Sequence, residues 1–158
     1  MHYLDRAVTA VNDASPRYRL GEVFQDPQTG YFYRYVQFKD AVTYAAGQVV
    51  SWAVSTGLTA VTNDCSGGSS IGAVPAGICQ AVMTQNYYGF ILVSGYYATI
   101  KTSGADDIAV GESLIMHAST DGTCDGVAAG STTTASFGVA MAADVDADNT
   151  VAGTVNLL

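Results

Sequence analysis

Two histidines, His2 and His117, are the only imidazole groups that the sequence offers for acid–base or nucleophilic chemistry. His2 lies at the start of the chain, and His117 ends a predicted strand without an acid nearby in the sequence to orient it. The only glutamates are Glu22 and Glu112, so no sequence pattern favours the carboxylate pair of a glycosidase. We therefore predict that the chain is not an enzyme. The alternative is a small all-β hydrolase, which would need His117 beside a Ser or Asp in a pocket.

Alternating acids at positions 144–149 (D-V-D-A-D-N) are the most metal-like feature of the sequence. A helix–loop–helix calcium loop begins in this way. Here, however, the sixth position is Asn149 instead of Gly, the twelfth is Val155 instead of Glu, and the flanking residues are strand-like. We interpret the stretch as a charged hairpin tip and predict no metal and no cofactor. A cation site of another kind is the alternative.

The glycine-rich stretch at 65–70 is not a phosphate loop, because neither a Lys nor a helix start follows it. The sequence contains three cysteines, Cys65, Cys79 and Cys124. An odd number without close spacing argues against both a disulfide framework and a zinc site. We expect small buried apolar residues, and the pairing of Cys65 with Cys124 stays open.

Paired tyrosines, Tyr87-Tyr88 and Tyr96-Tyr97, lie in or beside predicted strands. Neighbouring strand residues face opposite sides of a sheet, so one tyrosine of each pair should point outward. Outward tyrosines suit protein interfaces or sugar stacking, whereas half-buried sheet positions are the alternative. Together with bases and tyrosines near the start of the chain, they form our set of candidate interface residues: Tyr3, Arg6, Arg17, Tyr18, Arg19, Tyr87, Tyr88, Tyr96 and Tyr97.

Composition indicates one β-rich domain of low charge. The chain has 158 residues, 17 Gly and 10 Tyr, and its charged fraction of 13% is about half of the roughly 25% typical of globular chains. A surface with so few charges tends to associate, so we weigh obligate assembly against a compact monomer.

The net charge of −8 is unevenly distributed. Residues 1–39 contain five bases and four acids, whereas the remainder contains one base and ten acids. An acidic body repels phosphate backbones, so we predict no direct nucleic-acid binding. The Arg-bearing start would suit an acidic protein surface. The first residues do not form a signal peptide, and no stretch is long and apolar enough to span a membrane, so we expect a protein made in a cytoplasm without membrane contact.

The element pattern separates an arm from a β body. We assign residues 1–30 to an extended N-terminal arm and expect it to pack on a neighbouring molecule. A short helix is predicted over 3–11, with Leu4, Val8 and Val11 on one face. Residues 31–158 form the body, an antiparallel β-sandwich or barrel-like domain. The predicted strands are 31–38, 48–54, 58–62, 78–84, 90–93, 96–102, 111–117, 137–142 and 151–157.

A weak internal echo links residues 77–82 (G-I-C-Q-A-V) with 138–142 (G-V-A-M-A). Each segment is followed by a polar turn and a returning strand. One hairpin type used twice would produce this echo, and so would chance among small residues.

Three further segments add to the pattern: 20–23 (L-G-E-V), 30–38 (G-Y-F-Y-R-Y-V-Q-F) and 46–50 (A-G-Q-V-V). Together with 77–81, 88–95 (Y-G-F-I-L-V-S-G) and 137–142, they resemble head decoration (cement) proteins of tailed phages over most of residues 20–158. Residues 1–19 match no part of that pattern.

The resemblance implies a β-sandwich or barrel, often trimeric, docked on the outer surface of a phage head. Its partners would be the major capsid protein and two further copies of itself, and it would assemble in the host cytoplasm and remain in the virion. Such a protein acts by stabilising contacts between capsid subunits. The alternative function is a tail or fibre module that binds a receptor or carbohydrate through a groove lined by Tyr87, Tyr88, Tyr96 and Tyr97.

Overall fold

Strands make up nearly all the regular structure of the described chain. The computed structural model describes residues 2–39, 43–53, 57–64, 74–104, 107–128, 135–144 and 149–158. Its strands are β1 (His2–Tyr3), β2 (Val23–Gln25), β3 (Phe32–Phe38), β4 (Val49–Trp52), β5 (Ala60–Thr62), β6 (Pro75–Cys79), β7 (Tyr88–Lys101), β8 (Ser113–Met116), β9 (Cys124–Val127), β10 (Ser136–Ala140) and β11 (Thr150–Asn156). A 3₁₀ turn, η1 (Val8–Ala10), is the one helical element of these residues. The predicted all-β, barrel-like fold is confirmed.

Five strand segments close into a first ring. β3, β5, β4, β6 and residues 88–93 of β7 pair in this order, and β7 pairs again with β3. Closure removes the free sheet edges within the ring. Large side chains from every strand fill its interior: Val36, Phe38, Tyr44, Val50, Trp52, Val61, Cys79, Met83, Ile91 and Val93.

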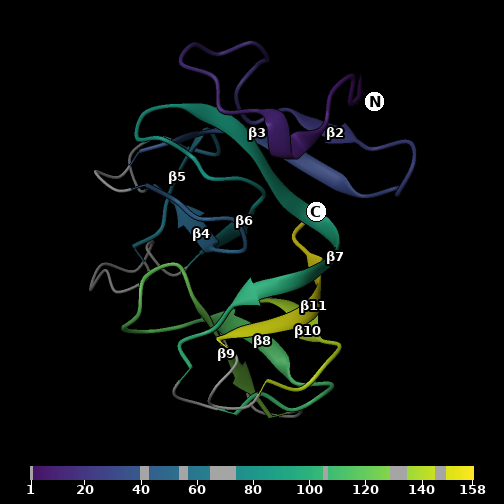
Figure 1. Ribbon diagram of the computed structural model, residues 1–158, viewed down its shortest axis with the longest axis vertical. Coiled ribbons are helices and arrows are strands. Elements are labelled where there is room, and N and C mark those ends of the chain that lie inside the picture. The colour runs from purple at the N-terminus through teal and green to yellow at the C-terminus, as the bar shows by residue number, and fades with distance from the viewer. Residues whose placement is uncertain are drawn as a thin grey trace.

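A second ring follows along the same long strand. Residues 94–101 of β7 pair with β11, and β10, β8 and β9 continue the order. Thr102, directly after β7, then pairs with Cys124 of β9 in a parallel bridge that completes the ring. Figure 1 shows β7 running from the upper ring into the lower one, beside β11. β7 is therefore the structural link between the two rings.

The rings repeat one strand pattern. Strands β4, β5 and β6 of the first ring correspond in pairing and direction to β8, β9 and β10 of the second. The parallel pair that closes the first ring, Phe38 with Val61, corresponds to Thr102 with Cys124 in the second. The first residue of each parallel pair also makes an equivalent backbone hydrogen bond, since Phe38 N–H donates to Tyr87 O and Thr102 N–H donates to Asn149 O. The second ring is thus a structural copy of the first.

A glycine corner opens each copy. The corner glycines Gly47 and Gly111 have φ of 84° and 89°, a region that favours glycine. Each glycine N–H donates to a carbonyl of the partner strand, Cys79 or Ala140. The N–H group of this partner residue donates in turn to the carbonyl of the residue that follows the glycine. The residue that follows the glycine donates its own N–H to the carbonyl three positions earlier in the chain. The same corner occurs a third time at Gly21, with Tyr35 as its partner.

The internal echo in the sequence arises from this duplication. Gly77 pairs with Val50 and Gly138 with Leu114, so the two glycines occupy equivalent positions. A Cβ at either position would collide with a backbone carbonyl of the next strand, that of Leu92 or Thr154. One hairpin type is used twice, and both copies need glycine where two strands approach closely.

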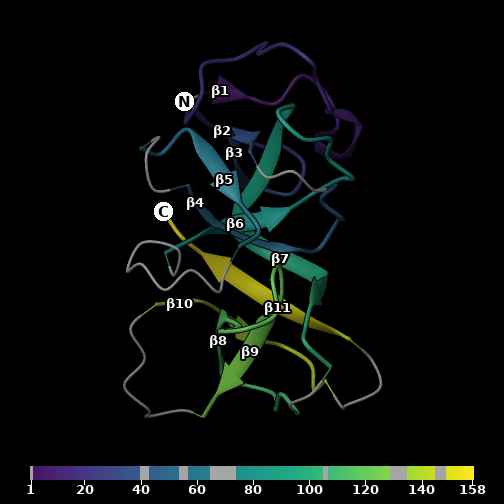
Figure 2. The same cartoon turned by 90° about the vertical axis from the view of Figure 1, so that its left-hand side faces the viewer.

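The first residues extend the sheet of their own chain. β1 pairs parallel with β2, and β2 pairs antiparallel with β3. Val11 is buried, and Leu4 and Val8 pack against the same cluster. The predicted helix over 3–11 is wrong, because β1 and η1 take its place, although its three apolar residues do face the core. Residues 2–25 pack on β3 and β7 of their own chain, at the upper end of the molecule in Figure 2, and contact of the arm with a neighbouring molecule stays a prediction.

Some strand boundaries also differ from the prediction. The last hairpin, β10 and β11, is confirmed. β6 begins earlier than predicted, at Pro75, and ends at Cys79, after which Met83 makes only an isolated bridge with Tyr44. β9 was missed, because its sequence C-D-G-V has the composition of a turn. It forms because Met116 and its neighbours on β8 offer a complementary edge.

Candidate functional site

An ionic cluster joins two of the candidate interface residues, Arg6 and Arg17, near the start of the chain. Asp13 Oδ1 lies 3.2 Å from Arg17 Nε and 3.6 Å from Arg6 Nη1, the latter beyond hydrogen-bonding distance. The hydroxyl of Tyr35 donates to Asp13 Oδ2 at 3.4 Å. Two cations and a hydroxyl thus surround one carboxylate, which holds the N-terminal segment on β3. Sequence reasoning missed Asp13, and its spacing of four residues from Arg17 was the available signal.

Tyr18 anchors this cluster to the core. Its hydroxyl donates to Asp5 Oδ1 at 2.6 Å. That hydrogen bond, followed by burial and the charge of Asp5, raises the pKa of Tyr18 to about 12. The Tyr18 ring makes edge contacts with Phe24 and Tyr35 at 5.0 and 5.1 Å between centroids. Tyr18 therefore acts mainly as a packing residue here, with only part of its surface available to a partner.

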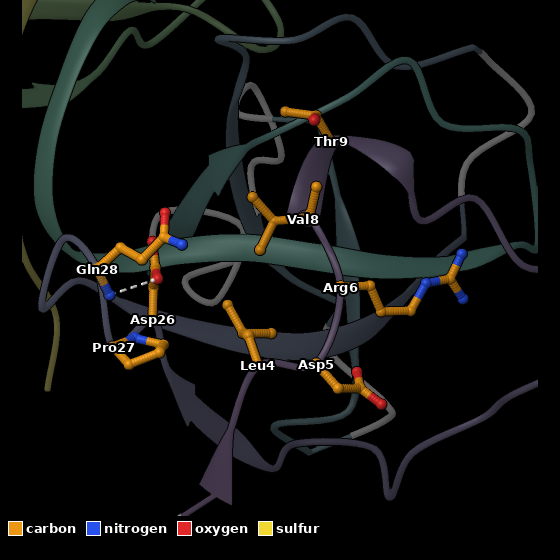
Figure 3. Close-up of a pocket in the computed structure, with 9 residues that line it drawn as sticks. Leu4, Asp5, Arg6, Val8, Thr9, Asp26, Pro27 and Gln28 are labelled. Atoms are coloured by element: carbon orange, nitrogen blue, oxygen red, sulfur yellow. Dashed lines mark hydrogen bonds between the residues drawn. The ribbon is translucent and has the colours of Figure 1, made fainter.

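A surface hollow of about 430 Å³ lies beside this segment, lined by residues 4–9 and 26–28. In Figure 3, Leu4 and Val8 lie between the Asp26–Gln28 turn and Arg6, which extends away from that turn. Asp26 accepts the backbone N–H of Gln28 at 2.9 Å and the hydroxyl of Thr29 at 2.7 Å, and these bonds lower its pKa. The hollow combines an aliphatic centre with charged rims, a combination that suits a protein side chain.

The two tyrosine pairs do not come together. Tyr88 begins β7 and Tyr96 lies eight residues further on, so the two are roughly 25 Å apart along an extended strand. Tyr88 faces the N-terminal cluster, since its hydroxyl accepts Gln37 Nε2 at 3.2 Å and its backbone bonds with Asp13. Tyr97 is half-buried against the core, and Tyr87 is also half-buried. The structure therefore forms no single groove from these four residues.

Tyr96 instead belongs to an uncharged face of the second ring. Tyr96 on β7, Thr154 on β11, Val139 on β10 and Ser113 on β8 are successive cross-strand partners in one row. Tyr96 is 43% and Val139 40% exposed. Met141, two residues along from Val139, is 56% exposed. This set, which we call the outer face, presents apolar and hydroxyl groups without a charge. Sequence reasoning found only Tyr96, because the row depends on strand order.

The remaining candidates lie at the N-terminal end of the molecule. Tyr3 on β1 is 61% exposed, and Arg19 is also exposed. Figure 2 shows this end above the first ring, on the far side from β8 to β11. The candidate interface residues thus divide into an N-terminal group and Tyr96 with Tyr97, and they do not make one continuous site.

Both histidines have structural partners. His117 Nδ1 accepts the backbone N–H groups of Ser119 and Thr120 at 3.2 and 2.9 Å, so it stabilises the turn after β8. His2 Nε2 lies 2.9 Å from Glu22 Oε1. In this arrangement the Nδ1 atom of His117 is occupied and does not face a nucleophile.

The cysteines in the described residues are buried. Cys79 and Cys124 are free thiols, and burial raises the pKa of each to about 12, with Asp125 and Asp144 adding to the effect at Cys124. Cys65 lies outside the described residues, as do the glycine-rich stretch and most of the acidic stretch after Asp144. Such buried, protonated thiols are chemically inert.

The described residues contain neither a cluster of metal ligands nor a membrane-spanning helix. No group of three or more His, Cys, Asp or Glu side chains is placed to hold a metal ion there. No helix among those residues has the length and apolar character needed to cross a membrane. Comparison of the chain with protein-family models and with curated proteins finds no match.

Proposed function

We propose that this chain is a structural decoration protein of a tailed-phage head, which binds the outer surface of the shell and stabilises contacts between major capsid protein subunits. The observation that carries the proposal is the outer face of the second ring. A row of uncharged, partly exposed side chains crosses four strands of a chain whose net charge is −8. Uncharged, partly apolar surface with tyrosine is typical of the centre of a protein interface.

The fold supports a binding role in a second way. Two closed rings joined by one 14-residue strand make an elongated body with two ends. The N-terminal end carries exposed Tyr3 and Arg19 and the aliphatic hollow, while the outer face lies on the second ring. On a phage head such a body would contact two neighbours at once, and the contacts of three copies in a trimer would add by avidity. The protein would then act only by binding its neighbours and holding them together.

No second function is proposed. A receptor- or sugar-binding tail module was expected to use a groove lined by the paired tyrosines, and β7 separates Tyr88 from Tyr96. A hydrolase was expected to place His117 beside a nucleophile, and its Nδ1 instead accepts two backbone N–H groups.

The proposal is tested by counting copies of this chain in purified particles relative to the major capsid protein, with quantitative mass spectrometry. A ratio near one, as in shell-wide decoration, supports it. A handful of copies per particle, or none, overturns it.

A matched pair of variants tests the outer face. Val139→Asp places a charge in the row, and we expect occupancy on the head to fall at least tenfold, because an unpaired charge would be buried in the contact. Val82→Asp is the control, since Val82 is 62% exposed on the first ring, outside the row. Equal occupancy of both variants would remove the outer face from the interface.

A further inference from the structure

Each ring is closed at one end by three equivalent residues. In the first ring these closing residues are Phe38, Tyr44 and Met83, all at most 1% exposed. The rings of Phe38 and Tyr44 lie 4.8 Å apart, and Tyr44 exchanges two backbone hydrogen bonds with Met83, of 3.0 and 3.1 Å. Large side chains therefore seal the end of the first ring.

The second ring places smaller and more polar residues at the same positions. Ile108 exchanges backbone hydrogen bonds of 3.0 and 2.9 Å with Asp144, as Tyr44 does with Met83. Thr102 occupies the place of Phe38, because it makes the parallel pair with β9. The closing residues of the second ring are therefore Thr102, Ile108 and Asp144.

Three oxygen atoms at this end have no partner. Asp144 is 1% exposed and Thr102 5% exposed, so both are more than nine-tenths buried. In the described structure, both carboxylate oxygens of Asp144 and the hydroxyl of Thr102 are buried without a hydrogen bond. Most buried polar groups in folded proteins are hydrogen-bonded, and an isolated buried carboxylate is strongly unfavourable.

A cation would remove this deficit. Carboxylate and hydroxyl oxygens are hard ligands, which Ca²⁺ accepts together with backbone carbonyls and water. The sequence also carries carboxylates at positions 146 and 148, directly after Asp144. Those two positions lie outside the described residues, and the two ligands that the structure describes are Asp144 and Thr102.

We propose that Asp144 and the hydroxyl of Thr102 bind a calcium ion at the closing end of the second ring. The ion would take the place that the bulk of Phe38, Tyr44 and Met83 fills in the first ring. This site is independent of the proposed role on a phage head, since it concerns the stability of the ring and not its docking.

The experiment compares the thermal unfolding of the full chain in CaCl₂ and in NaCl of equal ionic strength, after dialysis against a chelator. The salt control is needed because screening alone stabilises a chain of net charge −8. We expect calcium to raise Tm by about 5 °C at a large excess over its Kd, as a ligand that binds only the folded state does. Equal Tm values in the two salts overturn the proposal.

Variants locate the ion. Asp144→Asn keeps the shape of the side chain and should abolish the calcium-dependent rise, while Thr102→Val should reduce it by half or more. Asp121→Asn removes an equal charge from an exposed turn and should keep the full rise. A full rise in Asp144→Asn overturns the site, and a full rise in Thr102→Val overturns the assignment of its hydroxyl as a ligand.

Discussion

The two rings agree in their backbone and differ at their closing ends. Their corners, their close-packed glycines and their parallel closing pairs repeat bond for bond. The first ring closes with Phe38, Tyr44 and Met83, whereas the second closes with a Thr, an Ile and an Asp. Since one backbone accepts both sets, strand pairing and not the closing residues determines the fold. The residues at the closing end of the second ring can therefore differ from those of the first ring without changing the fold.

The largest expected effect comes from exchanging the closing residues between the rings. Met83→Asp places an unpaired carboxylate in the sealed end of the first ring and should lower the free energy of unfolding by about 3–5 kcal/mol. Asp144→Met removes such a carboxylate and, in calcium-free buffer, should leave stability unchanged or raise it by about 1 kcal/mol or more. Urea unfolding of both variants measures the difference. Equal destabilisation would mean that Asp144 has partners that balance its burial.

A smaller asymmetry is expected at the corner glycines. A Cβ at Gly47 would collide with the carbonyl oxygen of Thr99, whereas no heavy atom lies within 4 Å of a Cβ at Gly111. Gly111→Ala should cost only the roughly 1–2 kcal/mol of a left-handed conformation. Gly47→Ala should cost about 3 kcal/mol or more, because the second ring must move away from the first.

Chemical-denaturation midpoints of these two single variants provide the measurement, with the unchanged chain as reference. A loss of stability that is the same in both variants contradicts the described contact between Gly47 and β7.

Most strands could be predicted because their alternation is local. The 31–38 segment alternates along its length, and the last two strands flank an acidic turn. β9 could not be predicted, since its strand character comes from pairing with β8 and not from its own residues. The duplication was visible only as an echo, because the repeated units share glycines and turn geometry while their core residues differ.

The candidate site was harder to predict than the fold. Arg6, Arg17 and Tyr18 do gather near one another, but the carboxylates that organise them, Asp5 and Asp13, were not singled out. The row of the outer face depends on β11 lying between β7 and β10, and strand order is a long-range property. The closing residues of the second ring can be recognised only by comparison with those of the first.

The smallest effect concerns the third corner, at Gly21. Tyr18 precedes Gly21 by three residues, as Tyr44 precedes Gly47, but its hydroxyl bonds to a carboxylate. The pKa of Tyr18 is about 12 in the folded chain, against an ordinary value of about 10. A raised pKa favours the protonated folded form, so its contribution is complete below pH 10 and is lost as the pH rises from about 10 to 12. Tyr18→Phe should therefore flatten the decline in unfolding midpoint over that interval.

Tyr33 provides the internal control for this titration. Burial, with a further contribution from the charge of Asp26, also raises its pKa to about 12. Asp5→Asn removes the charge that acts on Tyr18 and leaves Tyr33 in place. Phenolate absorbance should then show one more tyrosine that titrates at lower pH, while Tyr33 still titrates late. If Asp5→Asn leaves the absorbance titration unchanged, the hydrogen bond between Tyr18 and Asp5 does not hold the third corner, at Gly21. The three corners would then share their backbone geometry without any side-chain support of this kind.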